Sequence, residues 1–143
     1  MTIHNKENPS VIRTKLSKQI VVAFRNIAKQ GLLNDDVKDS TAYIFFLLKD
    51  IQSTIETTAI AWEKRDYWVK ADRFRREWQW VDNTLSVLDS ILNENKWEKF
   101  PDFIASISRG LQALKVKLSN KDLNARNWNG AYKALETKSR FVY

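Results

Sequence analysis

The chain has no cysteine, one histidine, three glycines and two prolines among its 143 residues. Without cysteine it can form no disulfide and no thiolate metal site, and nothing indicates an oxidising compartment. The single histidine, His4, lies in a polar N-terminal stretch. Histidine-based metal sites are thereby excluded, and histidine acid–base catalysis is not expected. Three scattered glycines cannot form a glycine-rich loop for phosphate groups. We therefore expect no metal and no cofactor.

Long apolar runs are absent as well. No stretch approaches the ~20 apolar residues that cross a bilayer, and the first ten residues are polar. We expect a cytoplasmic protein without a membrane span. The scarcity of glycine and proline favours long helices, and a chain of this length suits one domain. We expect an all-α chain in which residues 1–9 form a disordered tail and residues 10–143 form a single helical domain.

Apolar residues recur at spacings of three and four, which is the period of an amphipathic helix. The first such segment predicts a helix over residues 11–30, with Ser10 as its N-cap and Gly31 as its left-handed C-cap. The second helix begins after the cluster at residues 34–36, whose acidic side chains suit a helix N-terminus. A tight turn or sharp kink is expected at residues 63–66, because the apolar stripes on either side differ in phase.

The third apolar stripe is the most regular and predicts one helix over residues 67–92, capped by Asp66. A polar loop separates it from a fourth helix, expected over residues 100–118, in which Gly110 is a weak point or a point of close packing. A final short helix is expected over residues 122–138. Four apolar-striped helices with short connections predict an up-and-down four-helix bundle with a short additional C-terminal helix.

The most unusual segment is residues 62–80, which contains four tryptophans and six basic residues. On a helix, Arg73, Arg76 and Trp80 lie nearly opposite the apolar stripe, and Arg76 and Trp80 are spaced for a cation–π contact. Either the C-terminal segment covers Trp80, or these residues form an exposed patch typical of protein interfaces. Phe46 also points away from the core side of its helix. It needs a second burying surface, which is the last helix or another subunit.

Basic residues dominate two parts of the chain, whose net charge is +7. Residues 11–33 carry five basic and no acidic side chains, and residues 103–143 carry eight basic and two acidic ones. The candidates for contact with an anionic partner are Arg13, Lys15, Lys18, Arg25, Lys29, Lys115, Lys117, Lys121 and Arg126. No recognition-helix motif, RNP motif or zinc module accompanies them. A solvated face, or attraction between oppositely charged helices, is the alternative.

Paired carboxylates are the remaining catalytic option. Asp82 and Asp89 are seven residues apart, and so they share one helix face. They flank the apolar stripe, however, where solvated acidic side chains normally lie. We expect no enzymatic activity.

The stretch of residues 56–78, ETTAIAWEKRDYWVKADRFRREW, resembles small all-helical cyanobacterial proteins of unassigned function. The resemblance implies a cytoplasmic bacterial protein and supplies neither an activity nor a site residue. Taken together, the sequence predicts a non-enzymatic helical protein that binds another protein, or itself as a homodimer, in the role of an adaptor, assembly or regulatory factor. The alternative is binding to nucleic acid or another anionic surface through basic helix faces.

Overall fold

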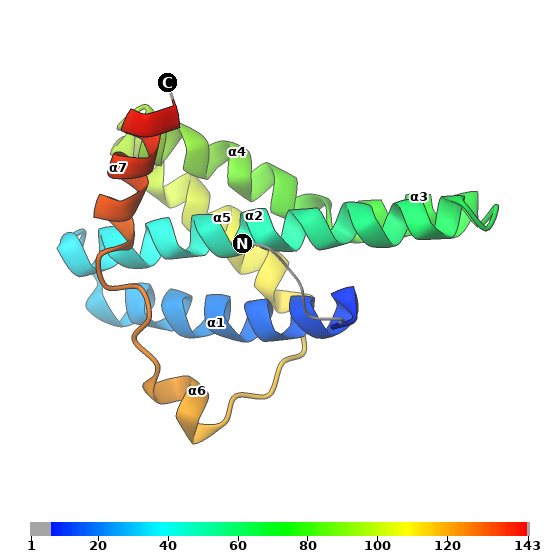
Figure 1. Cartoon of the computed structure of the whole chain (residues 1–143). Helices are drawn as coiled ribbons and strands as arrows, with labels where there is room; N and C mark the ends of the chain where they lie inside the picture. Colours follow the sequence, from blue (N-terminus) through cyan, green and yellow to red (C-terminus); the bar gives the residue numbers. More distant parts are fainter. Residues whose placement is uncertain (1–6, 143) are drawn as a thin grey trace.

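The computed structural model describes residues 7–142, and within them every regular element is a helix (Figure 1). The all-α prediction is confirmed. None of the helices in this part of the chain combines the length and the hydropathy that crossing a membrane requires. The elements in chain order are α1 (Pro9–Gln30), α2 (Asp35–Glu63), α3 (Trp68–Glu77), α4 (Gln79–Asn93), the 3-10 turn η1 (Trp97–Lys99), α5 (Phe100–Gln112), α6 (Asn120–Asn124) and α7 (Ala131–Val142).

Helices α1 and α2 form an antiparallel pair joined by a short connection. The N-cap of α1 is Asn8 rather than Ser10, since the Asn8 side chain accepts a hydrogen bond from the Ser10 N–H at 2.8 Å. Pro9, which was expected in the N-terminal tail, is already helical; residues 1–6 of that expected tail lie outside the described part of the chain. Gly31 ends α1 with a φ of 69°, as predicted.

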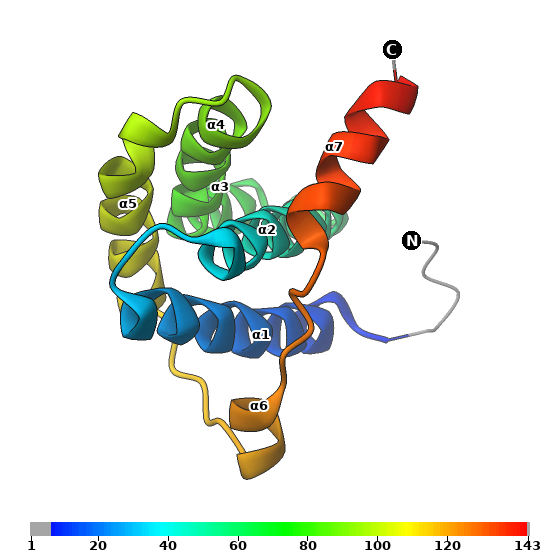
Figure 2. The same cartoon turned by 90° about the vertical axis from the view of Figure 1, so that its left-hand side faces the viewer.

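Helix α2 occupies the centre of the molecule, with α1, α3, α4 and α7 packed against it (Figure 2). In an up-and-down four-helix bundle every helix lies on the perimeter, so this topology is not confirmed. The central position explains the all-round apolar composition of residues 42–48. Ile44 and Leu48 are fully buried, and α7 provides a second covering helix for α2.

The helix predicted over residues 67–92 is interrupted at Trp78, where α3 ends and α4 begins. Neither glycine nor proline marks the break, which is why the sequence pattern did not reveal it. The rings of Trp78 and Trp80 stack with their centroids 6.0 Å apart. Side chains two residues apart in a continuous helix do not face each other. The stacked pair is therefore compatible with the interruption and incompatible with an unbroken helix.

Three further boundaries differ from the prediction or refine it. The expected turn after α2 is present, but Asp66 has a φ of 64° and does not cap α3; the N-cap is Tyr67, which makes no side-chain capping bond. Helix α5 ends at Gln112 instead of the predicted residue 118. The chain then leaves α5 and leads to α6, which packs against α1. The predicted final helix is two helices separated by a segment that contains Gly130, with a φ of 81°.

The core lies where α1, α2, α4 and α5 meet, and it is almost wholly aliphatic. A buried hydrogen bond of 2.6 Å between the hydroxyls of Thr84 and Ser106 joins α4 to α5. This bond satisfies two polar groups that would otherwise be costly to bury. The fully buried side chains include Ile20, Ile44, Leu48, Ile51, Val81, Leu88, Ile91, Phe103 and Ile107.

Candidate functional site

Trp80 lies half-buried against α5 and is not on an exposed face. A Cβ atom added to Gly110 would overlap the Trp80 ring, with the Cζ3 atom at 2.7 Å. The close packing considered for Gly110 is confirmed by this contact. The cover over Trp80 is therefore α5, and neither the C-terminal segment nor a partner is needed to explain its burial.

The other residues of the predicted interaction site, Arg73, Arg76 and Phe46, have different surroundings. Arg73 and Arg76 are exposed on α3, but Arg76 forms an ion pair with Asp72 at 2.9 Å. Phe46 is half-buried, and its ring meets Phe45 edge-on with centroids 6.1 Å apart. The exposed aromatic surface that the prediction requires is consequently supplied neither by Trp80 nor by Phe46.

Exposed aromatic surface is found instead at the turn between α2 and α3, which projects beyond the other helices (Figure 1). Tyr67, Trp68 and Val69 are 52%, 59% and 71% exposed, and Ile60 near the end of α2 is 43% exposed. Three exposed cations, Lys64, Arg65 and Lys70, lie next to them in the sequence. We call this surface the hairpin tip and define it by Ile60, Lys64, Arg65, Tyr67, Trp68, Val69 and Lys70.

The sequence pattern did not predict the hairpin tip, because Tyr67 is the first residue of the third apolar stripe and is therefore expected in the core. A signal was nevertheless present. Tyr67, Trp68 and Val69 are consecutive, and successive helical side chains point about 100° apart, so they cannot all face one core. An apolar run of this kind beside a predicted turn indicates an exposed surface.

An ion-pair cluster joins the two helices of the hairpin formed by α2 and α3. The Arg75 guanidinium bonds Glu56 at 3.2 Å and also bonds Glu63, so that one α3 side chain joins two turns of α2. Hydrogen bonds from Arg75 lower the pKa of Glu63, and the two carboxylates raise the pKa of Arg75. Nearby, the Trp62 ring packs edge-on against Phe74 with centroids 5.0 Å apart.

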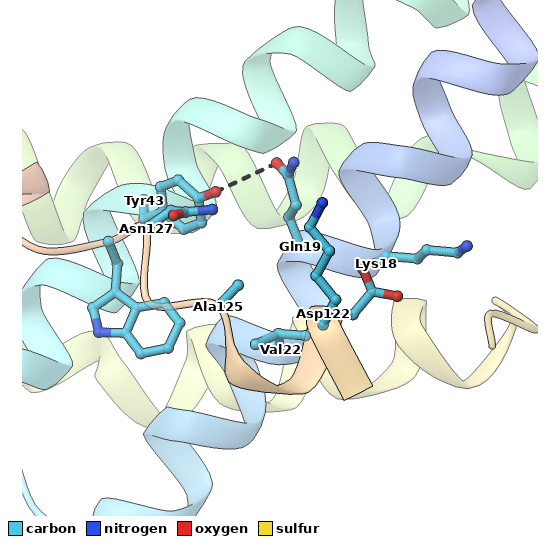
Figure 3. Close-up of a pocket in the computed structure, with 9 residues that line it drawn as sticks. Lys18, Gln19, Val22, Tyr43, Asp122, Ala125 and Asn127 are labelled. Carbon is cyan, nitrogen blue, oxygen red and sulfur yellow. Dashed lines mark hydrogen bonds between the residues drawn. The ribbon is translucent and has the colours of Figure 1, made fainter. Parts of the chain in front are cut away.

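A second candidate surface gathers cations that are far apart in the sequence. Lys18, Arg25 and Lys29 lie at helical spacing on one side of α1, and the segment of residues 121–128 runs beside them. Lys18 and Lys121 line a hollow of about 190 Å³ (Figure 3). An adjoining hollow of about 160 Å³ is lined by Arg25, Lys29 and Arg126. We call this surface the basic face; its members are Lys18, Arg25, Lys29, Lys121 and Arg126.

Polar groups from three elements also converge in the hollow of Figure 3. The Tyr43 hydroxyl donates a hydrogen bond to Gln19 at 3.4 Å, and Asn127 lies beside the Tyr43 side chain. Burial raises the pKa of Tyr43, and a hydrogen bond with Asn127 opposes this. Asp122 is occupied at the wall, where it accepts a hydrogen bond from the Ser119 N–H at 2.8 Å. The hollow thus combines neutral hydrogen-bonding groups with two lysines and the Asp122 carboxylate.

The segment that completes the basic face is fixed by the N-terminal turn of α2. The Trp128 indole is 2% exposed and donates a hydrogen bond to Asp36 at 3.0 Å. Asp39 accepts bonds from the backbone N–H groups of Gly130 and Tyr132, both at 3.0 Å. Two carboxylates therefore hold the chain after α6 at a defined position relative to α1.

Arg13 does not belong to the basic face, contrary to the prediction. Its side chain is 7% exposed and donates hydrogen bonds to the Thr54 carbonyl and the Thr58 hydroxyl, both at 3.1 Å. The guanidinium carbon lies 4.8 Å from the centroid of Phe74 and 5.8 Å from that of Trp78. Burial lowers the pKa of this guanidinium. Arg13 of α1 is thus buried against α2 and the aromatic rings of Phe74 and Trp78.

The remaining predicted cations are exposed and do not line either of the two hollows at the basic face. Lys15 forms an ion pair with Glu7. Lys115 and Lys117 lie in the connection between α5 and α6. The structure thus brings five of the nine predicted cations together on one surface.

The two carboxylates considered for catalysis, Asp82 and Asp89, bond different neighbouring side chains. Asp82 and Asp89 are exposed, and their carboxylates accept hydrogen bonds at 2.7 Å from Gln52 and Asn93 respectively. Over residues 7–142, no group of three or more histidine, aspartate or glutamate side chains is arranged to hold a metal ion.

In comparisons with protein-family models, with curated proteins and with solved structures, nothing matched this chain. The resemblance of residues 56–78 to cyanobacterial proteins therefore stays a prediction. The hairpin tip and the basic face are the two candidate binding surfaces of the chain.

Proposed function

We propose that the protein acts without catalysis, by binding another protein through the hairpin tip. The observation that supports this is the exposure of Tyr67, Trp68 and Val69 on one projecting turn. Tyrosine and tryptophan are enriched at the energetic centres of interfaces because they bury large areas at a small entropic cost. Exposed aromatic residues grouped on a projection are suited to insertion into a groove of a partner.

The charge of the hairpin tip indicates the nature of the partner. Lys64, Arg65 and Lys70 surround the aromatic residues, and Asp66 is the single acidic residue among them. A two-fold homodimer through the same surface would bring these like charges together, which is unfavourable. The tip therefore suits a different protein, whose apolar groove is bordered by acidic side chains.

The test is site-specific photo-crosslinking with the full chain in its source cells. A photoreactive phenylalanine at position 68 is expected to capture one defined protein, whereas the same group at position 32 captures none. Leu32 is a matched control, since it is 62% exposed at the opposite end of α2. The capture should be lost in Tyr67→Ser, and this variant should keep the wild-type melting temperature. Equal capture from both positions would contradict the proposal.

The basic face supports a second candidate function, which is binding to nucleic acid. Single strands and duplexes attract clustered cations, and the affinity falls with salt in proportion to the phosphates contacted. Arg25→Gln combined with Arg126→Gln should weaken binding and reduce the salt slope by about 2. Arg73→Gln combined with Arg76→Gln removes the same charge from α3 and should leave the slope unchanged. Absence of wild-type binding at low salt would eliminate this candidate.

A further inference from the structure

Arg13 is a buried cation with no carboxylate partner among the described residues. Its hydrogen bonds go to uncharged oxygens of Thr54 and Thr58, and its flat face rests on Phe74 and Trp78. Buried charges in proteins are normally paired, because an isolated one is costly to remove from water. The bonds at Arg13 all use one terminal nitrogen, Nη1, so the guanidinium has further donors to offer.

An open hollow of about 490 Å³ adjoins Arg13, between the start of α1 and the end of α2. This volume lies within the range of small-molecule sites, roughly 300–1,000 Å³. A second cation, Arg65, stands at the hollow, and hydroxyl groups come from both helices. The described residues that line it include no carboxylate; they are Asn8, Pro9, Ser10, Arg13, Thr57, Thr58, Ala61, Trp62 and Arg65.

The backbone adds to the positive potential of this hollow. It contains the first turn of α1, a helix of 22 residues whose first turn carries no acidic side chain. The N–H groups of Ser10, Val11 and Ile12 already bond Asn8, so this turn contributes its dipole and not free donors. Two arginines and several hydroxyls can donate hydrogen bonds to a tetrahedral oxyanion, which accepts them from several directions.

We propose that this hollow binds the phosphate group of a small molecule, with Arg13 at its inner wall and Arg65 at its rim. The site is distinct from the basic face, and it shares Arg65 with the hairpin tip. Arg13 also joins α1 to α2 and α3, so a bound phosphate supplies the missing counter-charge at the point where these three helices meet.

The experiment is titration of the full chain with inorganic pyrophosphate at low ionic strength, followed by calorimetry. Arg65→Gln is expected to weaken binding about 10-fold or more, as loss of a charge-assisted hydrogen bond would. Because Arg65 is exposed, the melting temperature of the free variant should not change. Arg13→Met should abolish binding, and its thermal unfolding in the absence of pyrophosphate reports how far Arg13 also supports the fold.

Two control variants separate a built site from general attraction to a basic protein. Arg73→Gln removes an exposed arginine from α3, outside the hollow. Lys115→Gln removes a cation that lines a different hollow, of about 290 Å³, on the other side of Arg13. Both should bind pyrophosphate as the wild type does. The proposal is overturned if the wild type does not bind, if Arg65→Gln binds normally, or if either control loses as much affinity as Arg65→Gln.

Discussion

Gly110→Ala provides a direct test of how Trp80 is buried. In an ordinary helix interior this substitution stabilises by about 1 kcal/mol, because alanine has the higher helix propensity. At Gly110 the new Cβ would overlap three ring atoms of Trp80, of which Cζ3 is the most distant at 2.7 Å. Favourable carbon–carbon contacts require about 3.5–4.0 Å, so the ring or the helix must move.

The ring has little freedom to move, since Trp80 is stacked on Trp78. Overpacking typically costs 1–3 kcal/mol, and an overlap with three ring atoms belongs in the upper part of that range, about 2–3 kcal/mol. After the gain of about 1 kcal/mol in helix propensity, Gly110→Ala should destabilise the protein by about 1–2 kcal/mol. In a Trp80→Ala background the obstacle is absent, and the same substitution should stabilise by about 1 kcal/mol. Gly110→Ala should therefore lower the free energy of unfolding in the wild type and raise it in the Trp80→Ala background.

Urea denaturation followed by far-UV circular dichroism measures all four members of this double-mutant cycle. Circular dichroism is preferable to fluorescence here, because one substitution removes a tryptophan. If Gly110→Ala stabilised the protein equally in both backgrounds, Trp80 would not pack on α5. The explanation for its burial would then be wrong, and Trp80 would return as a candidate for an exposed interface.

Three further predictions concern hydrogen bonds and backbone geometry. Arg75 lowers the pKa of Glu63 in the folded protein. The stability from this pair is therefore present above the unfolded pKa of Glu63, about 4.3, and is lost as pH falls through the folded pKa. The urea midpoint of Glu63→Gln should therefore depend less on pH below about pH 5 than that of the wild type. Trp128→Phe should destabilise by about 1–3 kcal/mol, because it leaves Asp36 Oδ1 without its indole donor. Trp97→Phe is the matched control, since the buried Trp97 Nε1 has no hydrogen-bond partner in the described residues, and a comparable loss there would refute the reasoning. Gly31→Ala should cost about 1 kcal/mol by thermal denaturation, since Gly31 has a φ of 69°, and a neutral result would contradict the left-handed cap.

The helical segments were predictable from apolar spacing, whereas their arrangement was not. The spacing of residues 11–30 and the position of Gly31 describe α1 within two residues, because local capping decides both ends. The apolar run at residues 42–48 correctly indicated burial on more than one side. The central position of α2, however, depends on which helices pack on each side. That is a property of tertiary contacts with no local sequence signature.

The candidate sites were likewise predictable only in part from the sequence. The clustering of positive charge was predictable, but which cations meet was decided by Trp128 and two carboxylates of α2, which bring residues 121–128 to α1. Arg13 fits a solvated α1 face by composition alone. Its burial depends on Phe74 and Trp78, more than 60 residues away. Long-range contacts of this kind cannot be read from the local pattern around Arg13.

The tryptophan-rich segment shows why composition overstates an interaction surface. Of its four tryptophans, Trp62 packs on Phe74, while Trp78 and Trp80 stack on each other where α3 ends and α4 begins. These three rings orient the hairpin and connect it to α5 and to Arg13. Only Trp68 is mostly accessible, at 59% exposure. The buried tryptophans therefore fix the hairpin so that Trp68 and its neighbours project, and the capacity for recognition is concentrated in that turn.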